Sequence, residues 1–143
     1  ENLVKKTNIG YTNCLIKTLM NFDYVDFDAE MNGKTTHYYS FIACVANGKR
    51  YGGGIKICPA ADPSDGKLNF VAVDKMKKAK IPFAFISLKG GKILEKKYTT
   101  MELTEHVKIT GKEGAIVQVD GELYENIPFE VTVVHNQLKM YRK

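Results

Sequence analysis

Short segments in which apolar and polar residues alternate recur along the chain, and this pattern constrains the fold more than any other feature of the sequence. It is clearest in the second half, where the alternating apolar positions are Val107 and Ile109, Val117 and Val119, and Phe129, Val131 and Val133. Because successive side chains of a β-strand point to opposite faces of the sheet, such segments can bury one face and expose the other. The second half of the chain is therefore predicted to form half-buried strands.

Turn signals separate similar segments in the first half. Residues 22–31 alternate around acidic side chains, and Asn32-Gly33 then supplies the two residues that adopt positive φ most easily in a hairpin turn. A returning strand is predicted over residues 38–46. The glycine run 52–54 indicates a turn or bulge with a strand on each side, and residues 68–73 predict a further short strand.

Two helices are predicted. Between about residues 6 and 20, apolar residues recur at spacings of three and four, which gives a helix one apolar stripe. Ile81-Pro82 opens an apolar run that Gly90-Gly91 closes, and proline in the first turn with glycine past the last turn indicates the second helix. With a last strand at residues 138–141, the predicted fold is mainly β: an antiparallel β-sandwich of about ten strands with two helices, in one domain spanning residues 1–143.

Length and composition fit a protein with one core. At 143 residues and 44% apolar content, the chain can bury enough surface to fold without disulfide bonds or a structural metal. Cys14, Cys44 and Cys58 are odd in number and lie in apolar stretches, which is typical of buried thiols in a reducing compartment. No run approaches the ~20 apolar residues of a membrane span, and the N-terminus lacks the pattern of a secretion signal. These features predict a cytoplasmic protein.

The formal net charge of +5 comes almost entirely from lysine. Positive potential attracts nucleic acids, anionic membrane surfaces and phosphorylated ligands alike. Only Arg50 and Arg142 carry the planar guanidinium that reads guanine edges or clamps phosphates with two hydrogen bonds, so no nucleic-acid partner is predicted. The lysines of residues 75–80 and Lys96-Lys97 have two open interpretations, a solvated face or a contact with anionic lipid headgroups.

Several familiar catalytic and metal-binding motifs are missing from the sequence. His37, His106 and His135 do not form a helical metal-binding pair, and there is no Cys-x-x-Cys pair. A Gly-x-Ser-x-Gly elbow and a P-loop are missing as well. Neither a zinc site nor a serine hydrolase of the α/β type is therefore predicted.

The loop over residues 59–68 is the first of two acidic motifs. It places Asp62 and Asp65 with several carbonyl groups in a tight turn. Hard cations bind in such oxygen-rich surroundings, and the same residues also form Asx turns without any metal. Spacing alone favours the turn.

The second acidic motif lies in residues 117–122. In a strand, the valines fall on one face, whereas Gln118, Asp120 and Glu122 fall on the other, so the acidic face is predicted to look outward. The motif has two interpretations, a functional acidic edge or a solvated strand end that enters an Asp-Gly turn. Spacing alone favours the turn here too.

Four ordered motifs together resemble one family: Val45-Ala46-Asn47-Gly48, Tyr51-Gly52-Gly53-Gly54, the loop from Cys58-Pro59 to Asp65-Gly66-Lys67-Leu68, and Asp120-Gly121-Glu122. Over nearly its whole length the chain is similar to the C-terminal half of lipid kinases of the diacylglycerol kinase and sphingosine kinase family. The resemblance implies an NAD kinase/diacylglycerol kinase-like C-terminal domain of a two-domain enzyme, with ATP in the cleft. In that family an N-terminal Gly-Gly-Asp-Gly-Thr loop approaches the phosphates of ATP. Because this sequence contains no such loop, the N-terminal phosphate-binding domain is expected to be missing from it and the chain to have little catalytic power alone.

The resemblance also implies roles for the second acidic motif. Glu122 is similar to the general base that accepts a proton from the lipid hydroxyl as this oxygen attacks the γ-phosphorus of ATP. Asp120 and Gly121 are similar to the adjoining edge of the nucleotide and metal site, where a carboxylate can orient a magnesium-bound water and glycine lets the backbone come close.

The first acidic motif is similar to a structural magnesium loop. Relatives hold this ion through backbone carbonyls and one carboxylate, and the matching positions are the carbonyls of Asp62 and Lys67 and the side chain of Asp65. Mg²⁺ and the co-substrate ATP are therefore the cofactors that the resemblance implies.

The implied acceptor is a diacylglycerol-like lipid at a membrane surface, so peripheral membrane association is expected. Phe83, Phe85, Ile86 and Leu88 are candidates for lipid contact, although apolar helix faces usually pack into the core. Two other functions stay open: a non-catalytic β module that binds a lipid or a protein, and a related kinase with a soluble acceptor. A homodimer is also compatible with the sequence.

Overall fold

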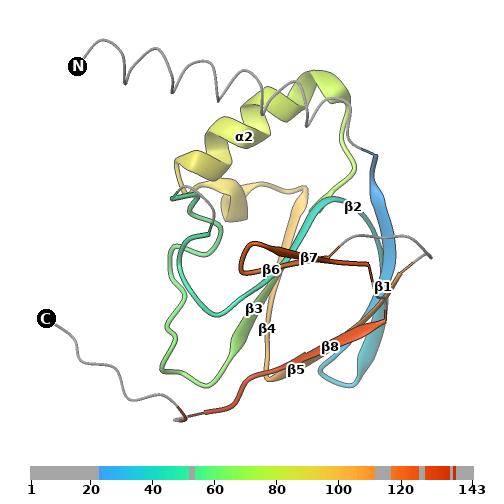
Figure 1. Ribbon diagram of the computed structural model, residues 1–143. Coiled ribbons are helices and arrows are strands. Elements are labelled where there is room, and N and C mark those ends of the chain that lie inside the picture. The colour runs from blue at the N-terminus through green and yellow to red at the C-terminus, as the bar shows by residue number, and fades with distance from the viewer. Residues whose placement is uncertain (1–22, 52–53, 112–116, 126–127, 136, 138–143) are drawn as a thin grey trace, which may run out of the picture.

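Strands dominate the structure. The computed structural model describes residues 23–51, 54–111, 117–125, 128–135 and 137. The strands are β1 Val25–Met31, β2 Lys34–Ala46, β3 Leu68–Asp74, β4 Thr99–Thr104, β5 His106–Gly111, β6 Val117–Val119, β7 Glu122–Tyr124 and β8 Phe129–Thr132. The helices are α2 Ile81–Lys89 and two short 3-10 helices, η1 Lys78–Lys80 and η2 Ile93–Glu95. Figure 1 shows α2 at one end of the large sheet.

Six strands form one antiparallel sheet in the order β4-β3-β2-β1-β5-β8, and β6 pairs with β7 in a separate two-stranded sheet. The first four strands are a meander of sequence neighbours. By contrast, β5 returns to the open side of β1, so that Phe27 lies opposite Tyr38 on one side and opposite Gly111 on the other. The predicted fold class, mainly antiparallel β, is confirmed.

The turn between β1 and β2 forms where Asn32-Gly33 predicts it. Both residues have positive φ, 52° at Asn32 and 74° at Gly33. This is the combination that a two-residue turn needs if its twist is to match the strands on either side. The turn fixes the register, with Met31 opposite Lys34, and β2 therefore begins at Lys34, ahead of the predicted start at Tyr38.

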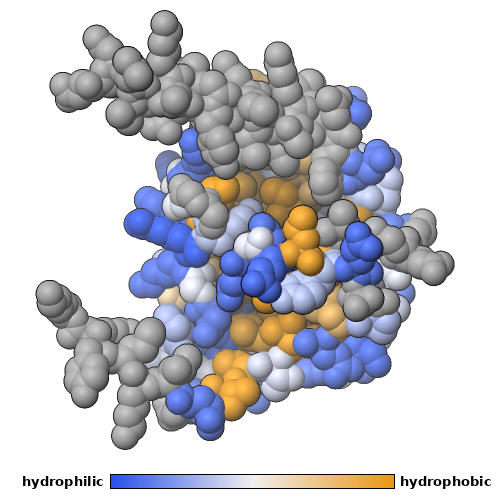
Figure 2. Space-filling model, viewed as in Figure 1, coloured by the Kyte–Doolittle hydropathy of each residue, from blue (hydrophilic) through white to orange (hydrophobic). Residues whose placement is uncertain are grey.

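Apolar clusters cover both faces of β3. Val71 and Val73 belong to the cluster that packs against α2, whereas Phe70 and Ala72 belong to the cluster on the opposite face of the sheet. Because both faces are covered, residues 68–73 are all buried and the strand is almost continuously apolar. Polar residues dominate the surface seen in Figure 2, with smaller apolar patches between them.

Helix α2 begins and ends where the proline and glycine signals predict. Pro82 lies in its first turn, and Gly91, just past its end, has φ 74°. The Lys92 N–H donates back to the carbonyl of Ser87 (2.8 Å), which satisfies one of the carbonyls left open at a helix end. In the described part of the chain, no helix is long and apolar enough to cross a membrane.

The structure differs from the sequence predictions at two places. The strand predicted directly after the glycine run is wrong: Ile55 makes only an isolated bridge to Tyr51, and Ile57 and Cys58 then enter the core below α2. Strand β4 was not predicted, because nothing in its own residues marks an edge strand before its pairing with β3 is known. The helix predicted near residues 6–20 and the strand at 138–141 lie outside the described residues.

Two cysteines lie in apolar surroundings. Cys58 is buried and Cys44 is half-buried in β2, whereas Cys14 lies outside the described residues. Burial raises the pKa of Cys44 from 9.0 to about 11. Burial, with a contribution from Cys44, raises the pKa of Cys58 from 9.0 to about 12. The prediction of a buried thiol is confirmed for Cys58.

We expect Cys58 to resist alkylation in the folded chain at neutral pH. A pKa of about 12 in place of 9.0 lowers the thiolate fraction about a thousandfold, and the thiolate is the species that attacks. Iodoacetamide labelling followed by peptide mass spectrometry, with and without urea, measures the effect. Equal labelling rates of Cys58 in the two conditions would contradict this account.

Candidate functional site

The second acidic motif forms the tip of the β6–β7 hairpin. Asp120 and Gly121 have φ of 48° and 104°, and Val119 pairs with Glu122 across the turn. This confirms the Asp-Gly turn that the spacing favours. Asp120, Gly121 and Glu122 are all exposed, so the acidic edge faces outward as expected. In the view of Figure 1 the hairpin lies in front of the large sheet.

Glu122 is held by a neighbour that the sequence analysis did not single out. The Tyr124 hydroxyl donates to Glu122 Oε2 at 2.8 Å, because residues two apart on a strand share one face. This hydrogen bond to a carboxylate raises the pKa of the Tyr124 phenol. The spacing of Glu122 and Tyr124 in the sequence was the available signal.

The first acidic motif folds into two consecutive Asx turns. Asp62 Oδ1 accepts from the Ser64 N–H (2.9 Å) and from the Ser64 hydroxyl (2.6 Å). Asp65 Oδ1 accepts from the Lys67 N–H (2.8 Å), and the Asp65 N–H donates to the Asp62 carbonyl (3.2 Å). The turn interpretation of this loop is therefore correct as a description of its local structure.

The carbonyl and carboxylate oxygens of this loop are of the kind that can bind a magnesium ion. In the part of the chain that the structure describes, no group of three or more His, Cys, Asp or Glu side chains is placed to hold a metal. An ion here would therefore depend on backbone carbonyls together with Asp65. A carbonyl oxygen has two lone pairs and a carboxylate has two oxygens, so the existing turns leave acceptor capacity at Asp62 and Asp65. This all-oxygen set is the kind that magnesium binds.

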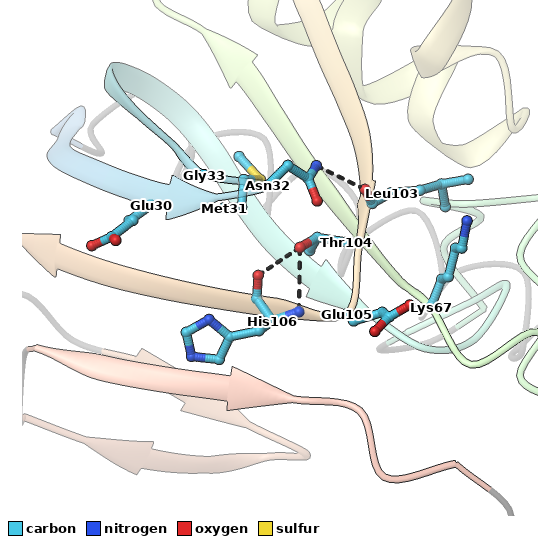
Figure 3. Close-up of a pocket in the computed structure, with 9 residues that line it drawn as sticks. All are labelled: Glu30, Met31, Asn32, Gly33, Lys67, Leu103, Thr104, Glu105 and His106. Atoms are coloured by element: carbon cyan, nitrogen blue, oxygen red, sulfur yellow. Dashed lines mark hydrogen bonds between the residues drawn. The ribbon is translucent and has the colours of Figure 1, made fainter.

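A cavity of about 330 Å³ opens between the β1–β2 turn and the corner that joins β4 to β5. Figure 3 shows its lining residues: Glu30, Met31, Asn32, Gly33, Lys67, Leu103, Thr104, Glu105 and His106. The Asn32 side-chain amide donates to the Leu103 carbonyl at 3.0 Å, which ties the two sides together. Nε2 of His106 lies 3.5 Å from an Oε2 oxygen of Glu130.

The structure does not bring the two acidic motifs to this one cavity. Lys67, from the first motif, lines the cavity, whereas Asp120, Gly121 and Glu122 do not. The other lining residues could not be identified from the sequence, because they come together only through the pairing of β1 with β5, which no local pattern predicts. The glycine run is described only in part: the Tyr51 and Ile55 backbones exchange two hydrogen bonds of 3.0 Å, and Gly52 and Gly53 lie outside the described residues.

A known family of domains matches nearly the whole chain. The model of the YegS C-terminal NAD kinase β-sandwich-like domain matches residues 1–142. Two proteins named diacylglycerol kinase, from Mycobacterium tuberculosis strains CDC 1551 and H37Rv, are each 33% identical over 103 residues. That match covers 71% of this chain and 32% of each relative, so the chain spans about a third of their length.

Two crystal structures of Bacillus anthracis strain Sterne proteins share the fold. One, from a candidate diacylglycerol kinase, gives a TM-score of 0.70 at 20% identity and covers 89% of this chain and 44% of that chain. The other, from a diacylglycerol kinase, gives a TM-score of 0.65 at 18% identity and covers 92% of this chain and 46% of that chain. The chain therefore belongs to the family of YegS C-terminal NAD kinase β-sandwich-like domains, the C-terminal domains of YegS and diacylglycerol kinase-type proteins.

Proposed function

We propose that this chain is the C-terminal domain of an ATP-dependent lipid kinase that transfers the γ-phosphoryl group to the hydroxyl of a diacylglycerol-like lipid. Membership of the family supports the proposal, as do relatives named diacylglycerol kinase. The observation that carries it is the outward-facing Glu122, which follows a two-residue turn and is oriented by Tyr124 at 2.8 Å.

Glu122 acts in this proposal as the general base. Its carboxylate accepts the proton of the lipid hydroxyl as that oxygen attacks phosphorus, and a positioned base contributes about 10²–10⁴-fold in rate. The hydrogen bond from Tyr124 occupies one carboxylate oxygen, Oε2, and fixes the direction of the group. Tyr124 is thus a positioning residue. Asp120 and Gly121 form the adjoining edge of the ATP site, where the turn exposes the backbone of Gly121 to a ligand.

Phosphoryl transfer depends mainly on holding the phosphates and the acceptor oxygen in line. The sequence contains no Gly-Gly-Asp-Gly-Thr loop to hold the phosphates. In the proposal this task falls to an N-terminal domain that packs against the present chain. The chain alone is then expected to have little kinase activity.

The direct test is an assay of the complete protein that contains this chain. With labelled ATP, we expect label to move to diacylglycerol presented in mixed micelles and not to glycerol or to nucleosides. Labelling of a soluble acceptor with none on the lipid would favour the related soluble kinase instead. A failure to consume ATP with any acceptor would favour a non-catalytic module.

In the proposal, the carbonyls of Asp62 and Lys67 and the carboxylate of Asp65 hold a magnesium ion that braces the loop. Magnesium should therefore raise the melting temperature of the chain, because a ligand that binds only the folded state stabilises it by mass action. Asp65→Ala should remove most of that increase.

Asp62→Ala is the matched control, since it breaks an equivalent Asx turn and leaves its own carbonyl in place. Differential scanning fluorimetry over a magnesium titration measures the effect, with calcium as a second ion. A melting temperature that magnesium leaves unchanged in the unsubstituted chain would rule out the ion.

A further inference from the structure

Helix α2 is apolar on its outer side as well as on its inner side. The inner side, formed by Ile81, Ala84, Phe85 and Leu88, is at most 4% exposed and packs into the core. On the outer side Phe83 is 70% exposed and Ile86 is 66% exposed. Residues three apart are neighbours on a helix surface, so these two side chains form one apolar patch.

Lysines surround this patch. Residues 75–94 contain six lysines and no aspartate or glutamate. Lys77, Lys78 and Lys80 are exposed in and beside η1, which leads directly into α2, and Lys89 and Lys92 are exposed at the other end. Two exposed hydrophobic side chains are thus bracketed by positive charge on both sides along the chain.

Two lysines of this segment already contact aromatic rings: Lys89 Nζ lies 5.6 Å from the centroid of the Phe85 ring, and Lys75 lies over two tyrosine rings. The Lys75 Nζ lies 4.8 Å from the centroid of the Tyr39 ring and 5.3 Å from that of Tyr24. These cation–π contacts place its ammonium group against Tyr39 of β2 and against Tyr24, which directly precedes β1. The other four lysines, Lys77, Lys78, Lys80 and Lys92, are exposed and can reach an external anion.

The combination of positive charge and exposed apolar side chains favours a bilayer surface over a protein surface as the partner of this patch. Lysine is depleted in the buried centres of protein interfaces, because its ammonium group is strongly hydrated. At a bilayer surface the same lysines stay in water and attract anionic headgroups, while exposed aromatic and aliphatic side chains enter the boundary with the acyl chains.

We propose that the outer face of α2, with Phe83 and Ile86 at its centre and Lys77, Lys78 and Lys80 at one end, docks onto an anionic lipid bilayer. The inner face anchors the helix in the core, so the docking surface is already formed and binding needs no folding step. This docking is independent of catalysis. It places the chain where a water-insoluble substrate is found, and it can be measured without ATP.

The experiment is co-sedimentation of the chain with vesicles of phosphatidylcholine, with or without phosphatidylserine. We expect binding to the vesicles that contain phosphatidylserine and a loss of binding as salt is raised. Phe83→Ser with Ile86→Ser should weaken it by about a hundredfold, roughly tenfold for each lost side chain. Lys77→Gln, Lys78→Gln and Lys80→Gln together should also weaken it by about a hundredfold.

Matched controls lie elsewhere on the described surface. Val134 is 66% exposed, so Val134→Ser removes an equally exposed apolar side chain, and Lys34→Gln with Lys49→Gln removes exposed lysines far from α2 in the sequence. Both controls should bind like the unsubstituted chain. Circular dichroism of every variant checks that the fold is intact.

Three outcomes would overturn the proposal. The first is no binding to either vesicle, and the second is binding that the Phe83 and Ile86 substitutions leave unchanged. The third is a chain that self-associates in sedimentation velocity and becomes monomeric with those substitutions, which would assign the patch to a second copy. None of these outcomes depends on kinase activity. A protein that lacks kinase activity but still binds vesicles would contradict the proposed function and support the docking surface.

Discussion

If the complete protein is the lipid kinase proposed above, replacing Glu122 with glutamine should lower its turnover number by about a hundredfold or more. Glutamine has nearly the same volume and keeps one acceptor oxygen, but it cannot take up the proton of the lipid hydroxyl. Because the substitution leaves the turn at Asp120-Gly121 in place, the KM for ATP should change little. Initial rates at saturating lipid, measured over a range of ATP concentrations, separate the two parameters.

Glu125→Gln is the matched control, since Glu125 is also exposed and follows Tyr124 directly. We expect this variant to turn over normally. Near-normal turnover in Glu122→Gln would reject the assignment of the base. The isolated chain gives a second measure: without the carboxylate at residue 122, the raised pKa of Tyr124 should return toward its ordinary range in a spectrophotometric titration.

Replacing Phe70 with alanine should destabilise the chain by about 3–5 kcal/mol, the range measured when buried aromatic residues are truncated. Phe70 is fully buried on β3, and its ring centroid lies 5.1 Å from that of Tyr38 and 6.4 Å from that of Phe27. Removing the ring leaves a cavity where the first two strands pack onto the third. For a chain of this size the melting temperature should fall by about 10 °C.

Phe83→Ala provides the comparison, because it removes the same side chain from a position that is 70% exposed. Its cost in unfolding free energy should stay within about 0.5 kcal/mol, as for other surface substitutions. Urea denaturation followed by circular dichroism measures both variants. Similar costs for the two would mean that Phe70 does not pack as described.

Local signals predicted the parts of the fold that local chemistry determines. Asn32-Gly33 predicted a hairpin turn because few residues adopt positive φ, and Pro82 with Gly90-Gly91 predicted both ends of α2. The pattern of α2 did not show which apolar side chains are buried. Phe85 and Leu88 are in the core, as favoured for helix faces, whereas Phe83 and Ile86 are exposed.

Features that depend on distant residues could not be predicted from the sequence. Strand β4 forms by pairing with the edge of β3. The cavity forms because the corner after Leu103 lies against the turn at Asn32. The same distinction between local and distant features applies to the candidate site. The order of the motifs predicted the family, whereas the support that Tyr124 gives to Glu122 became visible only with the strand in place.

The late pairing of β5 with β1 has a consequence during protein synthesis. Because β1 and β2 lie far ahead of β5 in the sequence, they are made well before it, and until β5 is added the nascent chain carries β1 with one side open, an edge that can pair with another molecule. Asp26, Asp28 and Glu30 alternate along β1. Like charges at these positions would disfavour pairing with β1 of a second nascent copy, so this edge would stay available until β5 arrives from the same polypeptide.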